Sequence, residues 1–127
     1  MNEWQRFGCP KPFRIVELGP GRGTLANDIS RVLLQFAHSK DVTSFHLIEI
    51  SPHLTQIQEQ TLCGTISLIE KQNNAMNGTH SSLTKNGMPI TWYKSLDHMP
   101  QEPGFTAFIA HEFFDALPIH KFMVIKT

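Results

Sequence analysis

Apolar residues along this chain follow two spacings, short continuous runs and the periodic stripe of a helix. Residues 14–18 form an apolar run, and residues 25–36 then carry apolar side chains at helical spacing. Further apolar runs predict strands at 44–50, 89–93 and 105–110, with a weaker helix after the second strand. Strands that alternate with helices are typical of α/β domains built on a mostly parallel sheet.

Polar stretches separate these elements. Residues 63–88 are rich in polar and turn-forming residues, which predicts an exposed loop or insertion in the domain. Residues 94–100 indicate a turn or short helix, and loose alternation over 119–125 predicts the start of a further strand. Residues 1–12 predict the tail of a helix followed by an extended approach to the first strand. We therefore expect one domain over residues 1–127.

Composition limits the class of protein. The 127 residues have room for one domain, and 11 basic residues balance 11 acidic ones. The sequence therefore predicts no nucleic-acid partner, and no apolar run reaches the ~20 residues of a membrane span. Cys9 and Cys63 have neither metal-site spacing nor a disulfide framework, so we expect no metal and a reducing compartment.

Three glycines follow the first predicted strand directly. Gly19, Gly21 and Gly23 permit positive φ and a close approach of backbone to ligand, and a helix start offers free N–H groups. This order predicts a nucleotide-binding loop. A glycine pattern alone is a weak signal, and the plain alternative is a turn that merely uses glycines.

Glu17 decides which nucleotide this loop is expected to bind. A carboxylate inside an apolar strand is costly unless it is paired, so it suggests a role at the ligand. It would repel the pyrophosphate of a dinucleotide, whereas S-adenosylmethionine carries a sulfonium and an ammonium group and no phosphate. The residue therefore favours S-adenosylmethionine over NAD, unless Glu17 is a solvated residue at a strand end.

A second acid ends the second predicted strand. Glu49 is followed by Ser51 and Pro52, which predict the cap and first turn of a helix. In βαβ nucleotide-binding units an acid at this place accepts hydrogen bonds from ribose hydroxyls. Leu96 and Asp97, after the third strand, are candidates for contact with adenine. A solvated Glu49 is the alternative to the ribose role.

His111, Glu112 and Asp115 follow the fourth predicted strand. Ligands of open α/β sheets bind outside the carboxyl ends of the strands, so these side chains are expected at the same edge as the glycine loop. Two carboxylates and an imidazole there suit a cationic substrate. The alternative for Glu112 and Asp115 is capping of a helix N-terminus, where acids are favoured by the dipole.

Four motifs in this order resemble one known family. VELGPGRGTL, HLIEIS, NGMPITWY and AHEFFDALPIHKF are similar to the mitochondrial protein arginine methyltransferases that act as complex I assembly factors. The resemblance covers almost the whole chain and implies a Rossmann-like class I methyltransferase fold, doubly wound on a mostly parallel sheet. It also implies that Glu17 and the three glycines hold the methionine part of the cofactor, and Glu49 its ribose.

The same resemblance implies an activity. The expected reaction is transfer of methyl groups to an arginine, giving symmetric dimethylarginine, on a core subunit of NADH:ubiquinone oxidoreductase in the mitochondrial matrix. Glu112 and Asp115, with His111, are expected at the acceptor site. Members of the family have further segments before and after the matched region, so the domain is expected to be the cofactor-binding part, truncated at both ends.

Two other readings of the sequence stay open. The chain could be a cofactor-binding or scaffold protein that aids complex I assembly without catalysis. It could also be an NAD-dependent oxidoreductase, against which Glu17 and the HEFFD stretch both argue.

Overall fold

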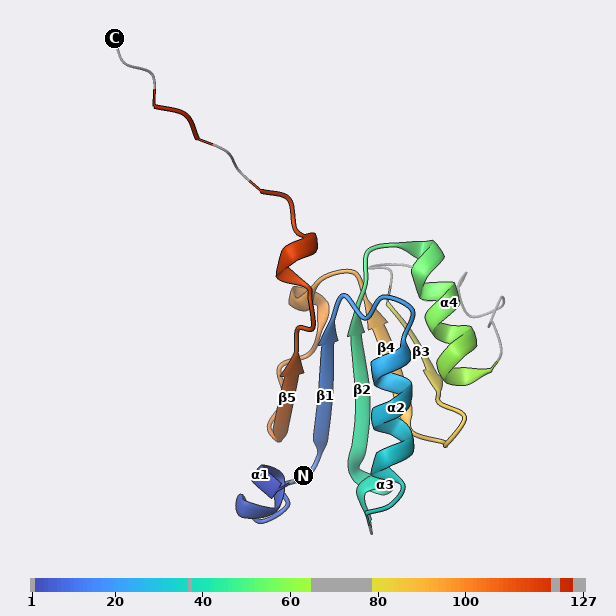
Figure 1. Ribbon diagram of the computed structural model, residues 1–127. Helices are drawn as coiled ribbons and strands as arrows, with labels where there is room; N and C mark the ends of the chain where they lie inside the picture. The colour runs from blue at the N-terminus through green and yellow to red at the C-terminus, as the bar shows by residue number, and fades with distance from the viewer. Residues whose placement is uncertain (1, 37, 65–78, 120–121, 125–127) are drawn as a thin grey trace.

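The residues described by the computed structural model, 2–36, 38–64, 79–119 and 122–124, form one five-stranded sheet (Figure 1). Its strand order is β3-β4-β2-β1-β5. Strand β1 pairs in parallel with β2 and β5, β2 pairs in parallel with β4, and β3 is antiparallel to β4. The strands are β1 (Phe13–Leu18), β2 (Thr43–Ile48), β3 (His80–Leu83), β4 (Pro89–Tyr93) and β5 (Phe105–Ile109).

Two longer helices lie on the same face of the sheet (Figure 1). Helix α2 (Thr24–Leu33) follows β1, and α4 (Pro52–Cys63) follows β2. The Ser51 hydroxyl accepts a hydrogen bond from the Leu54 N–H at 3.2 Å, which confirms the predicted cap of α4. The shorter elements are α1 (Asn2–Arg6), α3 (Ser39–Val42) and two 3₁₀ turns, η2 (Leu96–His98) and η3 (Phe114–Ala116).

The hydrophobic core lies between the sheet and these two helices. Alternate residues of each central strand point into it, as the twofold repeat of a strand requires. The buried face of α2 carries Ala26, Ser30 and Leu33; the first two are small and let the helix approach closely, and Leu33 belongs to the core. The buried core is formed chiefly by Phe13, Ile15, Phe45, Leu47, Ile90, Trp92 and Leu62.

The connection from β4 to β5 crosses the other face of the sheet. Arg14 on β1 donates hydrogen bonds to the backbone carbonyls of Glu102 and Pro103, at 3.0 and 2.8 Å. The chain therefore winds over both faces, and the expected Rossmann-like, doubly wound architecture is confirmed. Since β2 lies on one side of β1 and β5 on the other, the winding reverses between β1 and β5.

Three details of the sequence-based prediction were wrong. Part of the expected insertion at 63–88 is regular structure: residues 80–83 form strand β3, and Met88 is fully buried beside β4. The predicted strand at 119–125 is absent from the residues described there, since Ile119 and 122–124 are irregular and largely exposed. Val32, one of the apolar residues at helical spacing in 25–36, is half exposed rather than part of the core, because the buried face of α2 is formed by Ala26, Ser30 and Leu33.

His46 is a half-buried histidine on the face opposite the core helices. Its ring hydrogen-bonds the Ser44 hydroxyl through Nε2 at 2.9 Å and the Tyr93 hydroxyl through Nδ1 at 3.1 Å. Burial first, and then the nearby Arg14 guanidinium, lowers the pKa of His46 from 6.5 to about 4. The folded protein therefore holds this ring neutral at physiological pH.

This pKa predicts sensitivity to acid. Because the unfolded chain protonates His46 at higher pH than the folded chain, stability should fall as pH drops from 6.5 towards 4. We expect a loss of roughly 1–2 kcal/mol from this residue, less than the full value for the shift because the ring is not completely buried. Urea unfolding at pH 7 and pH 4.5 should show a smaller difference for His46→Gln than for the unmodified chain; equal differences would contradict the assignment.

Candidate functional site

A cavity of about 540 Å³ opens at the carboxyl ends of β1 and β5. It lies where the winding of the chain reverses, which is the place where open α/β sheets bind their ligands. Segments far apart in the sequence meet there, since the parallel register sets Glu17 on β1 opposite Ile109 on β5. The lining residues are Glu17, Gly19, Pro20, Gly21, Thr24, Leu25, Asp28, His111 and Glu112.

The glycine loop has the backbone shape that its sequence predicts. Gly19, Gly21 and Gly23 all have positive φ, at 60°, 57° and 83°. A Cβ on Gly21 would meet no atom within 4 Å, so the loop leaves open space there for a ligand. At Gly23, by contrast, a Cβ would lie 3.4 Å from the Cα of Gln58, so this glycine lets α4 pack against the loop.

Glu17 is the buried acid of the cavity. Its side chain is 4% exposed, and no group of the described residues donates a hydrogen bond to its Oε2 atom. Burial raises the pKa of the Glu17 carboxyl, and His111 partly opposes that rise. A buried carboxylate oxygen without a donor is costly, and a cationic ligand group would relieve that cost.

Glu49 follows β2 and is held by two donors. Its Oε1 accepts a hydrogen bond from the Ser51 N–H at 3.0 Å, and its Oε2 accepts one from Gln58 Nε2 at 3.1 Å. The same Nε2 donates to the Gly21 carbonyl at 2.7 Å. Glu49 and the glycine loop are therefore linked through one side chain.

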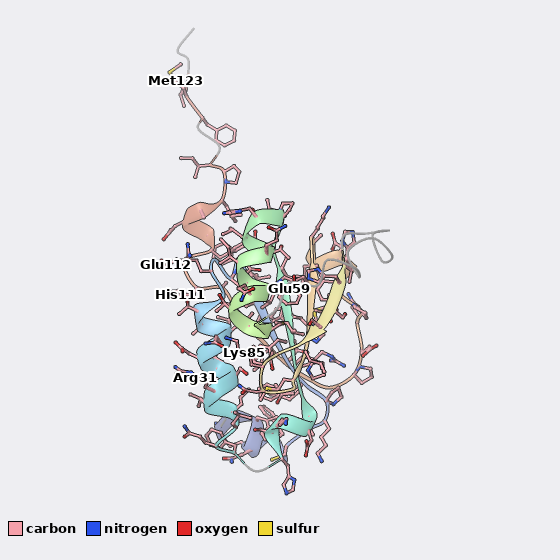
Figure 2. The ribbon with its side chains drawn as sticks, turned by 90° about the vertical axis from the view of Figure 1, so that its right-hand side faces the viewer. Arg31, Glu59, Lys85, His111, Glu112 and Met123 are labelled. Atoms are coloured by element: carbon pink, nitrogen blue, oxygen red, sulfur yellow. The ribbon has the colours of Figure 1, made fainter. Side chains whose placement is uncertain are left out.

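The segment after β5 is brought only partly into the cavity. Figure 2 shows His111 and Glu112 near the start of α2, and both residues line the cavity. Asp115, one turn further on in η3, is exposed and is not among the lining residues. Between them in sequence, the Phe113 ring lies against the glycine loop: a Cβ added to Gly19 would lie 2.7 Å from a ring carbon of Phe113. Glu112 has a φ of 54°, a left-handed conformation rare outside glycine.

Leu96 and Asp97 lie elsewhere. They line a second cavity of about 810 Å³, together with Arg14 and Phe108, on the face that the β4–β5 connection crosses. The expected grouping of these two residues with the glycine loop is therefore not observed in the described residues. Their predicted adenine contact remains a prediction.

Gln58 was missed at the sequence level. It is fully buried, although glutamine usually lies at the surface. Leu54, Gln58 and Leu62 are spaced by four residues and share one face of α4, so Gln58 interrupts an apolar stripe. A polar residue within an apolar stripe is the feature of the sequence that could have identified Gln58 as a buried residue with a hydrogen-bonding role.

The fold and the cavity together define a class of protein. A mostly parallel sheet with an acid at the end of its first strand, a glycine loop directly after that strand, an acid after the second strand and a cavity at the reversal point is consistent with a Rossmann-like class I methyltransferase domain. A family model described as "Putative S-adenosyl-L-methionine-dependent methyltransferase" matches residues 1–127. The chain belongs to this family, whose cofactor is S-adenosyl-L-methionine.

Curated relatives carry a more specific name. The Protein arginine methyltransferase NDUFAF7, mitochondrial, of Xenopus laevis is 45% identical over 131 residues, covering 99% of this chain and 29% of that protein. The human protein of the same name is 43% identical over 126 residues, covering 96% of this chain and 27% of that protein. The Drosophila melanogaster homologue is 39% identical over 125 residues, covering 98% of this chain and 28% of that protein. The chain thus spans less than a third of these relatives.

The cavity fits the cofactor of the family. The Glu17 oxygen that lacks a donor suits the ammonium group of the methionine part, and the space at Gly21 suits a ligand lying against the backbone. Glu49 keeps acceptor capacity on each oxygen beside its two donors, which suits ribose hydroxyls. Among the described residues, no helix is both long and apolar enough to cross a membrane.

Glu17→Gln should separate stability from ligand binding. Because burial raises the pKa of Glu17, its ionised form costs stability at neutral pH, and this cost disappears as pH falls to the ordinary value of 4.5. The variant should therefore melt higher than the unmodified chain at pH 7.5 and equally at pH 4.5. It should bind S-adenosylhomocysteine about tenfold or more weakly, because a charge-assisted hydrogen bond is lost.

Glu3→Gln is the control for this variant, because Glu3 is an exposed acid on α1. Differential scanning fluorimetry and calorimetric titration measure the two effects. Unchanged affinity in Glu17→Gln would show that this carboxylate does not contact the ligand.

Proposed function

We propose that this chain forms the cofactor-binding part of an S-adenosylmethionine-dependent protein arginine methyltransferase. The observation that carries the proposal is the meeting of the acids Glu17 and Glu112 with the glycine loop in one cavity. The printed names of the relatives, at 39–45% identity, support arginine as the acceptor.

Within this proposal the two halves of the cofactor are bound by different strands. Glu17 and the loop of Gly19, Gly21 and Gly23 hold the methionine part, and Glu49 accepts hydrogen bonds from the ribose hydroxyls. Leu96 and Asp97 are the candidates for the adenine contact, although they line the second cavity. Binding adenine there would require the ligand to extend from the glycine loop to the face that the β4–β5 connection crosses.

Glu112 is the best-supported acceptor residue. A guanidinium presents five N–H donors in a plane, and a carboxylate accepts from two of them at once. Glu112 lines the cavity beside Glu17, while His111 faces the same space. Asp115 joins them in the proposal as a residue that approaches the acceptor from the exposed η3 turn.

Methyl transfer from S-adenosylmethionine requires little of the protein beyond positioning of the reactants. S-adenosylmethionine supplies a methyl group already activated by its sulfonium. The role of the chain is to hold the acceptor nitrogen in line with that group, to exclude water and to stabilise positive charge on the guanidinium. His111 and the carboxylates of Glu112 and Asp115 provide groups near the acceptor that accept the proton released on methylation.

The resemblance of the four sequence motifs supports a more specific role. We propose that the product is symmetric dimethylarginine on a core subunit of complex I, and that the modification is needed for assembly of that complex. The relatives named here as mitochondrial support a mitochondrial location, and the substrate proposed implies the matrix.

Glu112→Gln and Asp115→Asn test the acceptor site. In the longest polypeptide that carries this sequence, we expect each variant to bind S-adenosylhomocysteine normally and to methylate arginine about 100-fold more slowly, because charge stabilisation at the acceptor is lost. Mass spectrometry of arginine-containing complex I peptides measures the rate and separates symmetric from asymmetric products.

Asp41→Asn is the matched control, since Asp41 is an exposed acid on α3 at the opposite end of the sheet. Normal methylation by both acceptor variants would remove the assignment. Cofactor binding by the unmodified protein without methylation of any arginine peptide would instead favour the non-catalytic scaffold.

A further inference from the structure

Gln58 uses both N–H donors of its amide group, and accepts one hydrogen bond, within the protein. It is 0% exposed on α4, and Nε2 donates to the Gly21 carbonyl at 2.7 Å and to Glu49 Oε2 at 3.1 Å. Oε1 accepts from the indole Nε1 of Trp92 at 3.0 Å. An amide NH₂ offers two donors, so none is left over for a ligand.

The neighbours of Gln58 determine which side chain can stand there. The Trp92 indole can only donate, whereas the Gly21 carbonyl and the ionised Glu49 carboxylate can only accept. The position therefore needs an acceptor at one end and two donors at the other, which also fixes the orientation of the amide. A glutamate would present a second carboxylate to Glu49, and an apolar side chain would leave all three partners without this contact.

The geometry couples the glycine loop, which lines the cavity, with Glu49, which follows a different strand and is not among the lining residues. The loop after β1 is held through Gly21, and the acid after β2 is held through Glu49. Helix α4 packs against the loop at Gly23, where an added Cβ would lie 3.4 Å from the Gln58 Cα. Trp92 in β4 is 1% exposed and anchors the far end of the amide in the core.

We propose that Gln58 is a positioning residue for the cofactor, which orients Glu49 for the ribose and fixes the glycine loop at Gly21 in one arrangement. The inference rests on the proposed role of Glu49 and the loop in binding the cofactor. Gln58 itself makes no contact with the ligand, so its contribution to affinity passes through Glu49 and the glycine loop.

A double-mutant cycle with Glu49→Ala tests this role. In the longest polypeptide that carries the sequence, Gln58→Met should weaken S-adenosylhomocysteine binding about tenfold when Glu49 is present. In the Glu49→Ala background the same change should have a clearly smaller effect, because one of the two groups that Gln58 holds is gone and only its hold on Gly21 remains. Calorimetric titration measures the four dissociation constants, and Gln56→Met, an exposed glutamine of the same helix, is the control.

Far-UV circular dichroism of each variant guards against loss of folding. A second variant, Gln58→Glu, keeps the volume of the side chain and the acceptor for Trp92, and it should weaken binding more than Gln58→Met because two carboxylates then face each other. Equal effects of Gln58→Met in both backgrounds, or normal affinity in Gln58→Glu, would overturn the inference. Normal affinity in Glu49→Ala alone would instead overturn the proposed ribose site, so the two failures are distinguishable.

Discussion

Parallel pairing of β1 with neighbours on both sides is the constraint on which the rest of this structure depends. Because β1 is central, its carboxyl end is surrounded by the ends of β2 and β5. The connection from β1 to β2 and the connection from β4 to β5 both leave from this edge of the sheet, and they cross opposite faces. The cavity forms there between the glycine loop that follows β1 and the segment that follows β5, with Glu17 of β1 among its lining residues.

The two faces of the sheet are covered by different kinds of interaction. On the helical face, the apolar residues of the strands meet α2 and α4, and burial of apolar surface drives the association. The opposite face carries polar groups that satisfy one another, with Arg14 bonded to the β4–β5 connection and His46 bonded to Ser44 and Tyr93. Hydrogen bonding there avoids the cost of unpaired polar groups beneath the connection.

Glu17 and Gln58 show two ways of burying a polar group. Both polar atoms of the Gln58 amide have hydrogen-bond partners within the protein, which links the loop to Glu49. Glu17 keeps an oxygen without a donor among the described residues, at a cost to the stability of the unliganded protein. A satisfied group stabilises a geometry, whereas an unsatisfied one at a cavity is suited to binding a ligand.

Local chemistry explains why much of the fold was predictable. Strands 13–18 and 89–93, the glycine loop and the Ser51 cap were recognisable because each depends on residues close together in the chain. Strand β3 was missed because its four residues, HSSL, have little apolar character and form a strand only by pairing with β4. The pairing of β3 with β4 is a contact between two segments, and the local sequence pattern of residues 80–83 does not encode it.

The candidate site also combines features that depend on local sequence with features that depend on contacts between distant segments. The sequence by itself determined that glycines and acids follow successive strands, because the type and spacing of these residues are local properties. Only the tertiary structure decided that His111 and Glu112 share a cavity with Glu17, that Asp115 stays outside it, and that Leu96 and Asp97 line another. It also decided that Gln58 links Glu49 to Gly21. These are contacts between distant segments, and the direction of each side chain depends on how the helices and loops pack on the sheet.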